Sequence, residues 1–249
     1  MYHMQGLSFR EYLHLFHQIS VRAYSLEEIL EHKVELHGVK HPLPLFEDYL
    51  KKGYYPFGLE EDFELRLKQI VNQTLETDIP LYAGMNVSTG RKLKQLLAIV
   101  VKSVPFKPNM TSIATALSAS RNNITDYCLF IEEAGMIAQL RDATGGIRGL
   151  GKVDNIYLDN TNLIYSLAND NPNTGNTRET FFLNQLRVKY EVIVSPLADF
   201  LIGDYTFEVD GKNKGKKQIL GIDKAFIVKD DIESGYLNTV PLWQFGMTY

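Results

Sequence analysis

Apolar residues recur at helical spacing through the first third of the chain. Three segments place them three or four positions apart, as amphipathic helices do: REYLHLFHQI, SLEEILEH and LFEDYLKKG. Ser8 precedes the first segment and Glu11 follows three residues later, which is the pattern of a capping box. Gly53 ends the third segment as a C-cap residue does. A longer periodic run, LEEDFELRLKQIVNQTLETDI, comes next, so residues 1–87 are predicted to be a helical segment.

Residues 88–160 are predicted to contain three further helices and a pair of strands. A serine-capped helix is expected over STGRKLKQLLAIVVKSV, a short one from Asn109, and a longer one over ITDYCLFIEEAGMI. IAQLRD and KVDNIYLD flank a glycine-rich turn and are expected to pair as a hairpin. Three helices followed by a hairpin is the winged helix-turn-helix pattern, in which the second long helix would enter a DNA groove.

Few cationic side chains accompany this predicted DNA-reading helix. Those that would contact phosphates are Arg121, Arg141, Arg148 and Lys152. The helix itself carries acidic side chains: Asp126, Glu132 and Glu133. Because DNA binding depends on several cationic contacts to phosphates, contact with a protein, or a scaffolding role, is as well supported as DNA binding.

Residues 161–249 are predicted to form a mixed α/β unit. A helix capped by Thr177 carries Glu179 in its first turn, and the runs YEVIVSP and AFIV suit strands. Gly203 and Asp204 lie between two runs of strand formers, which predicts a two-residue hairpin turn. The register that follows pairs Ile202 with Tyr205, Leu201 with Thr206, Phe200 with Phe207, and Asp199 with Glu208.

This register places two carboxylates opposite each other, with Cβ atoms about 5 Å apart. Like charges so close favour a bound cation, a raised pKa or a nearby lysine. Lysines follow at once: Lys212, Lys214, Lys216, Lys217 and Lys224. Asp199 and Glu208, with Glu179 nearby, would offer the hard oxygen ligands that suit Mg²⁺. A solvated hairpin edge with a charged loop is the alternative interpretation.

Composition and charge narrow the class of protein. A chain of 249 residues with 45% hydrophobic content suits one or two domains, and a net charge of -4 argues against a general nucleic-acid coat protein. The single cysteine, Cys128, lies in an apolar helical pattern and is predicted to be a buried small hydrophobe. No apolar run reaches the roughly 20 residues that span a bilayer. A cytoplasmic protein without membrane contact is expected.

Two weaker motifs predict no site. GIRGLGK at 146–152 fits half of a phosphate-binding loop, but Val153 stands where a Ser or Thr should hold Mg²⁺ and no strand and helix flank it. ATP is therefore not expected to bind this chain. His14 and His17 have the spacing of metal ligands, but no cysteine or HExxH motif accompanies them. They are expected to be surface histidines, as is His32.

Six phrases are similar to the C-terminal portion of bacterial AAA-type ATPases, in which a domain of unknown function follows a P-loop domain: MQGLSFREYL, HPLPLFEDYLKKGYYPF, SVPFKPN, IYLDNTNLIYSL, NTRETFFLNQL and FEVDGKNKGKKQI. The resemblance covers nearly the whole chain. It implies that residues 1–87 correspond to the lid helices after the ATPase core. The family's P-loop, acidic Mg²⁺ motif and sensor residues have no counterpart here. The resemblance therefore predicts a fragment or truncated member.

Residues 161–249 also resemble the PD-(D/E)XK nuclease fold, whose site combines an acidic residue on a helix, an Asp and a Glu-x-Lys. Glu179, Asp199 and Glu208 match these positions. Asp210 stands where the family has the lysine that stabilises the attacking water or the transition-state charge. Lys212 would replace that lysine only if the strand is bulged or bent. The resemblance implies a degenerate nuclease site kept for binding.

The expected fold is α+β: a helical lid-like segment, a winged helix over 88–160 and a nuclease-like domain over 161–249. The expected function is a regulatory and binding module of an ATPase, contacting nucleic acid or a protein, alone or as a homo-oligomer. One alternative is a Mg²⁺-dependent nuclease that uses Glu179, Asp199, Glu208 and Lys212, with Asp199 and Glu208 as metal ligands. The other is a structural protein-interaction module without a nucleic-acid role.

Overall fold

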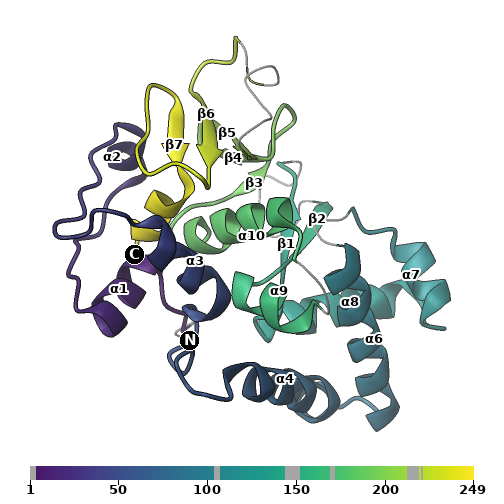
Figure 1. The fold of residues 1–249 in the computed structure, drawn as a ribbon. Coiled ribbons are helices and arrows are strands. Elements are labelled where there is room, and N and C mark those ends of the chain that lie inside the picture. The colour runs from purple at the N-terminus through teal and green to yellow at the C-terminus, as the bar shows by residue number, and fades with distance from the viewer. Residues whose placement is uncertain (1–3, 104–106, 144–151, 169–171, 212–218, 220) are drawn as a thin grey trace. The chain divides into compact units, whose positions relative to one another are not determined.

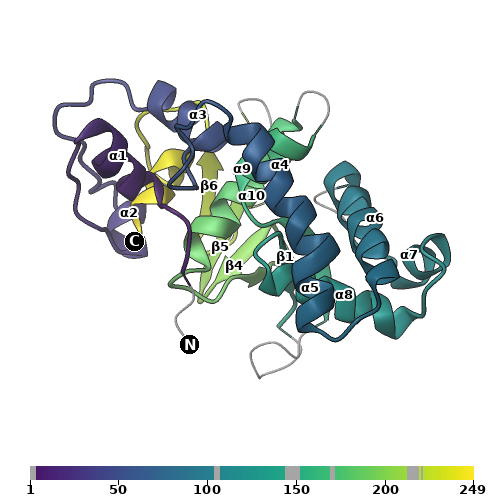
Figure 2. The same ribbon diagram turned by 90° about the horizontal axis from the view of Figure 1, so that it is seen from below.

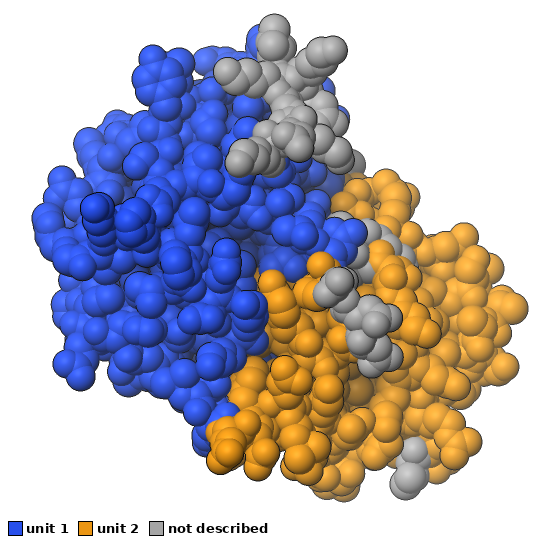
Figure 3. Space-filling model, in the orientation of Figure 1, with its two compact units in different colours: residues 1–60, 173–249 blue, residues 61–172 orange. Residues whose placement is uncertain are grey.

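The structure is a computed structural model that describes residues 4–103, 107–143, 152–168, 172–211, 219 and 221–249. It divides into two compact units (Figure 3). Unit 1 joins residues 1–60 with residues 173–249, and unit 2 consists of residues 61–172. The described residues form helices and two sheets, which confirms the α+β class (Figure 1). The N-terminal helices up to residue 60 thus belong with the C-terminal segment.

Unit 1 begins with three helices that the sequence pattern predicts: α1 (Phe9–His17), α2 (Leu26–Leu30) and α3 (Leu43–Lys52). The capping box of Ser8 and Glu11 at the start of α1 is confirmed. Helix α2 has a capping box of its own, formed by Ser25 and Glu28. Gly53 is the C-cap of α3, also as predicted. These ends are set by local sequence, because each cap satisfies main-chain groups within a few residues.

The described part of unit 1 contains a five-stranded sheet in the order β3–β4–β5–β6–β7. Its strands are β3 (Ile193–Val194), β4 (Phe200–Ile202), β5 (Tyr205–Asp210), β6 (Ala225–Lys229) and β7 (Thr239–Pro241). Strands β3, β4 and β5 are antiparallel, whereas β6 is parallel to both β5 and β7. Three predicted hairpin pairs are confirmed: Phe200 with Phe207, Leu201 with Thr206, and Ile202 with Tyr205. Gly203 has a φ of 56°, which glycine adopts readily in a two-residue turn.

Phe182 lies at the centre of an aromatic cluster in the core of unit 1. It belongs to α10 (Thr174–Leu186), and its ring centroid lies 5.1 Å from those of Phe200 and Phe207. The ring of Phe245, in the 3-10 helix η2 (Leu242–Met247), lies 4.9 Å away. All four side chains are fully buried. Helix α10 therefore covers the face of the sheet from which Phe207 projects. Figures 1 and 2 show the helix lying against the strands.

The start of α10 differs from the prediction. Asn173 is the N-cap, and its side-chain oxygen accepts the main-chain N–H of Asn176. Thr177, predicted to be the cap, lies inside the helix and its hydroxyl donates to the main-chain oxygen of Asn173. Several asparagine and threonine side chains in this segment are chemically able to cap a helix, so sequence alone did not identify the one that does.

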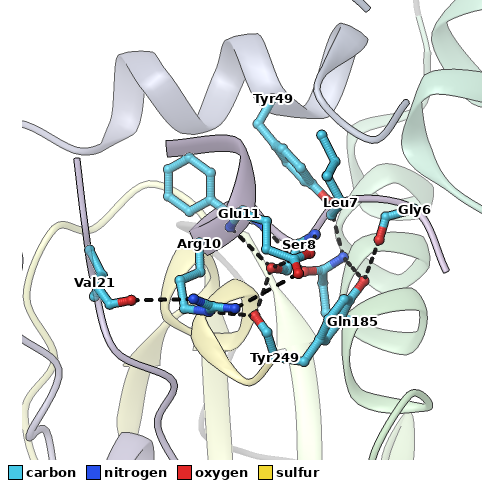
Figure 4. Close-up of polar contacts among 10 residues, drawn as sticks. Gly6, Leu7, Ser8, Arg10, Glu11, Val21, Tyr49, Gln185 and Tyr249 are labelled. Atoms are coloured by element: carbon cyan, nitrogen blue, oxygen red, sulfur yellow. Dashed lines mark hydrogen bonds and ion pairs between the residues drawn. The ribbon is translucent and has the colours of Figure 1, made fainter. Parts of the chain in front are cut away.

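A polar network ties the start of α1 to Tyr249 (Figure 4). Ser8 Oγ and Arg10 Nε each donate a hydrogen bond of 2.7 Å to the main-chain oxygen of Tyr249. The Tyr249 hydroxyl in turn donates to the main-chain oxygen of Gly6 at 3.3 Å. Burial raises the pKa of the Tyr249 phenol, which keeps it protonated as a donor. These bonds join segments of unit 1 that are far apart in the sequence.

Gln185 of α10 extends this network through the core (Figure 4). Its Nε2 donates to the hydroxyls of Tyr49 at 3.0 Å and Tyr249 at 3.4 Å. Its Oε1 accepts the main-chain N–H of Phe9 at 3.4 Å. Burial also raises the pKa of Tyr49 well above its ordinary value, and the Tyr49 hydroxyl donates to the main-chain oxygen of Leu7 at 2.7 Å. Gln185 thus connects three segments of unit 1.

Unit 2 is mainly helical. Its elements are α4 (Phe63–Gln73), the π-helix η1 (Thr74–Asp78), α5 (Ile79–Tyr82), α6 (Val87–Ser103), α7 (Met110–Ala116), α8 (Arg121–Glu133), β1 (Ile137–Arg141), β2 (Val153–Leu158) and α9 (Thr161–Leu167). Helices α4 and α5 continue one another through η1, as Figure 2 shows. The antiparallel pairing of β1 with β2 confirms the predicted hairpin. Helix α6 begins at Val87, so Ser88 lies inside the helix and is not its N-cap.

Two further expectations concern apolar residues. Cys128 is fully buried in α8, and burial raises the pKa of its thiol to about 12. This confirms that it packs as a small hydrophobe. Among the residues that the structure describes, no helix has the length and apolar character needed to cross a membrane.

Glu132 holds α8 to β1. Its carboxylate accepts two hydrogen bonds of 2.7 Å from Gln139, one from the main-chain N–H and one from the side-chain Nε2. Replacing Glu132 with alanine should lower the free energy of unfolding by about 1–2 kcal/mol, because both donors lose a charged acceptor. The matched control is Glu133→Ala at the exposed neighbouring position, which should change stability by less than about 0.5 kcal/mol. Equal losses in urea denaturation would contradict this role.

Candidate functional site

The parallel strands β5 and β6 end side by side, with Asp210 opposite Lys229. Ligand sites of open α/β sheets lie at the carboxyl ends of such strands. Glu208 and Asp210, each 8% exposed, share one face of β5 because strand side chains alternate. Phe207 projects from the other face towards α10. The two carboxylates therefore lie on the sheet face that α10 does not cover.

Asp199 does not complete the predicted carboxylate pair. Strand β4 begins at Phe200, and the main-chain N–H of Asp199 donates to the main-chain oxygen of Phe207 at 3.1 Å. Its Oδ2 accepts the main-chain N–H of Val209 at 2.7 Å. The fourth predicted pair, Asp199 with Glu208, is therefore absent from the ladder. The Asp199 carboxylate instead satisfies a main-chain donor of β5.

The structure does not gather Glu179, Asp199 and Glu208 into a three-carboxylate centre. Glu179 belongs to α10, which packs on the face of β5 opposite to Glu208. Within the described ranges, no three His, Cys, Asp or Glu side chains are grouped so that they could hold a metal ion. Lys212, the expected substitute for the nuclease lysine, lies outside the described residues. Among the residues described, these three carboxylates therefore do not form one group of metal ligands.

Asp210 occupies the strand position at which the nuclease resemblance places a lysine. Its Oδ1 accepts the main-chain N–H of Gly211 at 2.7 Å. Its Oδ2 is buried and has no hydrogen-bond partner in the described part of the chain. This position therefore supplies a hydrogen-bond acceptor where phosphodiester chemistry would need a cation.

An ion pair that no sequence pattern indicated lies at the same end of the sheet. Arg178 Nε, on α10, lies 2.5 Å from Oδ2 of Asp230, and the side chains are 19% and 20% exposed. The guanidinium packs against Gly211, where a Cβ would come within 2.7 Å of Arg178 Nη1. The sequence offers only weak signals for this ion pair: Arg178 directly precedes Glu179, and Asp230 directly follows β6. The Arg178 guanidinium therefore places a positive charge, paired with Asp230, at the ends of β5 and β6.

In unit 2, three of the residues expected to contact phosphates are described: Arg121, Arg141 and Lys152. Arg121 is exposed at the start of α8 and Lys152 is exposed just before β2, whereas Arg141 is half-buried. Asp142 accepts the main-chain N–H of Lys152 at 3.0 Å through Oδ1. Arg148 and residues 146–151 of the glycine-rich motif lie outside the described residues. In the described part of the hairpin, the acidic side chain of Asp142 thus contacts the main chain of Lys152.

The histidines do not form a metal site among the described residues. His14 and His17 are exposed, as predicted, and His14 Nδ1 lies 3.1 Å from Ser20 Oγ. His32 differs from the prediction because it is half-buried. Its Nε2 lies 2.8 Å from the main-chain oxygen of Leu237. Contacts between α2 and the segment before β7 have no local sequence signature, so the sequence did not predict this burial.

Comparison with known proteins identifies a family for more than half of the chain. A family model described as a domain of unknown function, DUF8612, matches residues 43–174. The matched segment includes α3 and all of unit 2. No curated protein and no solved structure matches the chain.

Proposed function

We propose that this chain, which belongs to the DUF8612 family, is a binding and regulatory module and not a nuclease. In this proposal it acts as the C-terminal portion of an AAA-type ATPase, whose nucleotide chemistry takes place elsewhere. The sequence resemblance supports the link to the ATPases. The observation that carries the non-catalytic role is the Asp199 carboxylate, whose Oδ2 accepts the main-chain N–H of Val209 at 2.7 Å.

In this proposal, the acidic residues of unit 1 form a degenerate nuclease-like site. Helix α10 carries Glu179, Asp199 directly precedes β4, and β5 carries Glu208, which is the order that the resemblance implies. Metal-assisted hydrolysis requires ligands for the cation and a positive group near the scissile phosphate. Asp210 occupies the position of that positive group, and the described residues assemble no metal centre. We therefore propose that the carboxyl end of β5 binds a partner without cleaving it.

A winged-helix arrangement is proposed for part of unit 2. Helices α6, α7 and α8 are followed by the β1–β2 hairpin, which is the element order of that motif. Helix α8 packs against α6, α7 and β1. Two cationic side chains of this arrangement are exposed: Arg121 at the start of α8 and Lys152 just before β2. With so few phosphate contacts, we expect DNA affinity of micromolar order or weaker at physiological salt.

This DNA contact can be tested by fluorescence anisotropy with a labelled duplex over a range of salt concentrations. We expect weak binding, a shallow salt dependence, and a several-fold loss in the double variant Arg121→Glu with Lys152→Glu. Lys68→Glu is the matched control, since Lys68 is exposed on α4 of the same unit. Tight sequence-selective binding would contradict the proposal, as would an equal loss in the control. Complete absence of binding would favour a protein partner.

A further inference from the structure

A tight turn just before β7 presents two large hydrophobic residues to solvent. The main-chain N–H of Tyr236 donates to the main-chain oxygen of Thr239, and that of Thr239 to the oxygen of Tyr236, each at 3.0 Å. Leu237 and Asn238 are therefore the two central residues of the turn. Tyr236 and Leu237 are 76% and 71% exposed. Single exposed hydrophobic residues are ordinary, but these two are neighbours, and we call the pair the tip.

Leu237 stands in this turn although the backbone conformation disfavours leucine. Its φ is 53°, in the left-handed region that bulky residues rarely adopt. Glycine or asparagine is the usual residue at a turn position with positive φ. Because Leu237 is largely exposed, burial within unit 1 offsets little of this strain. Strained residues cluster at functional sites such as ligand clamps, and contact with a second molecule would account for both the strain and the exposure of this leucine.

The tip is held in place by contacts from distant parts of unit 1. His32 Nε2 donates to the main-chain oxygen of Leu237 at 2.8 Å, because a carbonyl oxygen only accepts. Asn238 Nδ2 donates to the main-chain oxygen of Ala225 at 3.2 Å. The His32 ring also packs against Gly235, where a Cβ would come within 2.5 Å of it. A surface fixed in this way loses little conformational freedom when a partner binds.

A cavity of about 320 Å³ lies directly beside the tip. Ser234 and Gly235, the two residues before Tyr236, form part of its wall. The wall combines apolar and polar side chains, among them Val39, Trp243, Lys40, Glu233 and Ser234. Lys40 and Ser234 are exposed, so the cavity opens to solvent. Such a mixed wall suits a tyrosine, which offers an apolar ring and one hydroxyl that donates and accepts hydrogen bonds.

The tip and the cavity together make a surface that can pair with itself. In a two-fold symmetric interface, the same patch of both subunits must carry a projecting group and the hollow that receives it. Here both lie side by side on one chain, because Ser234 and Gly235 of the cavity wall continue into the tip. The cavity wall also carries one charge of each sign, Lys40 and Glu233, so two copies can face each other without an excess of like charge.

We infer that two copies of this chain associate through this surface about a two-fold axis. Tyr236 of each copy enters the cavity of the other, and Leu237 packs on the apolar part of the cavity margin. Tyrosine is among the residues that most often dominate binding energy at protein interfaces. A contact built on so few residues is expected to give a weak, reversible dimer. This inference does not rest on the proposed nucleic-acid or ATPase contacts.

Sedimentation equilibrium of the full chain between about 1 and 300 μM tests this association. We expect a monomer–dimer equilibrium for the wild type and at least about tenfold weaker dimerisation for Leu237→Asn. The melting temperature of the Leu237→Asn monomer should stay unchanged or rise, because asparagine tolerates a positive φ. A leucine needed only for folding would give the opposite shift. Leu197→Asn is the matched control, since Leu197 is 58% exposed in the same unit, and it should dimerise as the wild type does.

A mixing experiment tests whether the contact is reciprocal. Tyr236→Ser removes the inserted ring and Val39→Glu alters the cavity wall, so each variant alone should dimerise at least about tenfold more weakly. An equimolar mixture should dimerise more strongly than either variant, because one intact contact forms between Tyr236 of the second variant and the cavity of the first. A monomeric wild type over the whole range would overturn the inference and favour a foreign partner for the tip. A dimer that persists in Leu237→Asn and Tyr236→Ser, or open-ended assemblies in place of a closed dimer, would overturn it as well. The variants at the two exposed positions carry this test even if Val39→Glu does not fold.

Discussion

Replacing Phe182 with alanine is expected to lower the free energy of unfolding of unit 1 by about 3–5 kcal/mol. Phe182 is fully buried among Phe200, Phe207 and Phe245, so truncation would leave a cavity where α10, the sheet and η2 meet. Denaturant unfolding followed by Trp243 fluorescence measures this loss, because Trp243 is buried in the same unit.

Phe182→Leu is the matched control for this cavity. Leucine retains most of the apolar volume, so we expect a loss of about 1–1.5 kcal/mol. If Phe182→Ala cost no more than Phe182→Leu, α10 would not be packed on the sheet through this ring, and the described core of unit 1 would be wrong.

The second large effect is expected at Gln185. Gln185→Met should lower the free energy of unfolding by about 3 kcal/mol, because Phe9 N–H loses its acceptor and the hydroxyls of Tyr49 and Tyr249 lose a donor in a buried site. The same substitution at Gln244 should be nearly neutral or stabilising, because its Oε1 has no partner to lose among the described residues.

The two glutamines form a matched pair. They lie in the same unit, are 0% and 5% exposed, and receive the same substitution. Their difference in stability therefore measures the hydrogen bonds and not the change of side-chain type. Similar losses in the two variants, measured by the same denaturation experiment, would contradict the pairing described for Gln185.

The elements that the sequence predicted well depend on neighbours in the chain. The capping box at Ser8 and Glu11 acts within one helical turn, and the Gly203-Asp204 turn sets the register of the β4–β5 hairpin. The union of residues 1–60 with residues 173–249 depends instead on contacts such as Ser8 with Tyr249. No local pattern encodes such a contact. For the same reason, no prediction covered β7 or η2, whose formation depends on packing against distant segments.

The candidate site shows the same division. The hairpin register brought Asp199 close to the β5 strand, but the carboxylate's bond to Val209 N–H depends on where β4 begins. The ion pair of Arg178 with Asp230 requires the start of α10 to lie near the end of β6, which sequence does not specify. His32 and Gln244 meet at one cavity from segments about 200 residues apart, as their numbers show.

The central claim is that the acidic carboxyl end of β5 does not cleave nucleic acid. The most direct measurement incubates supercoiled plasmid and Mn²⁺ with the wild-type protein, with Asp199→Ala and with Asp210→Lys. The last variant restores the Glu-x-Lys spacing, but it adds no metal ligand to the residues described, which hold no group of three candidate ligands. We predict no Mn²⁺-dependent nicking by any of the three. Robust cleavage by the wild type that disappears in Asp199→Ala would contradict the account and make the protein an active nuclease.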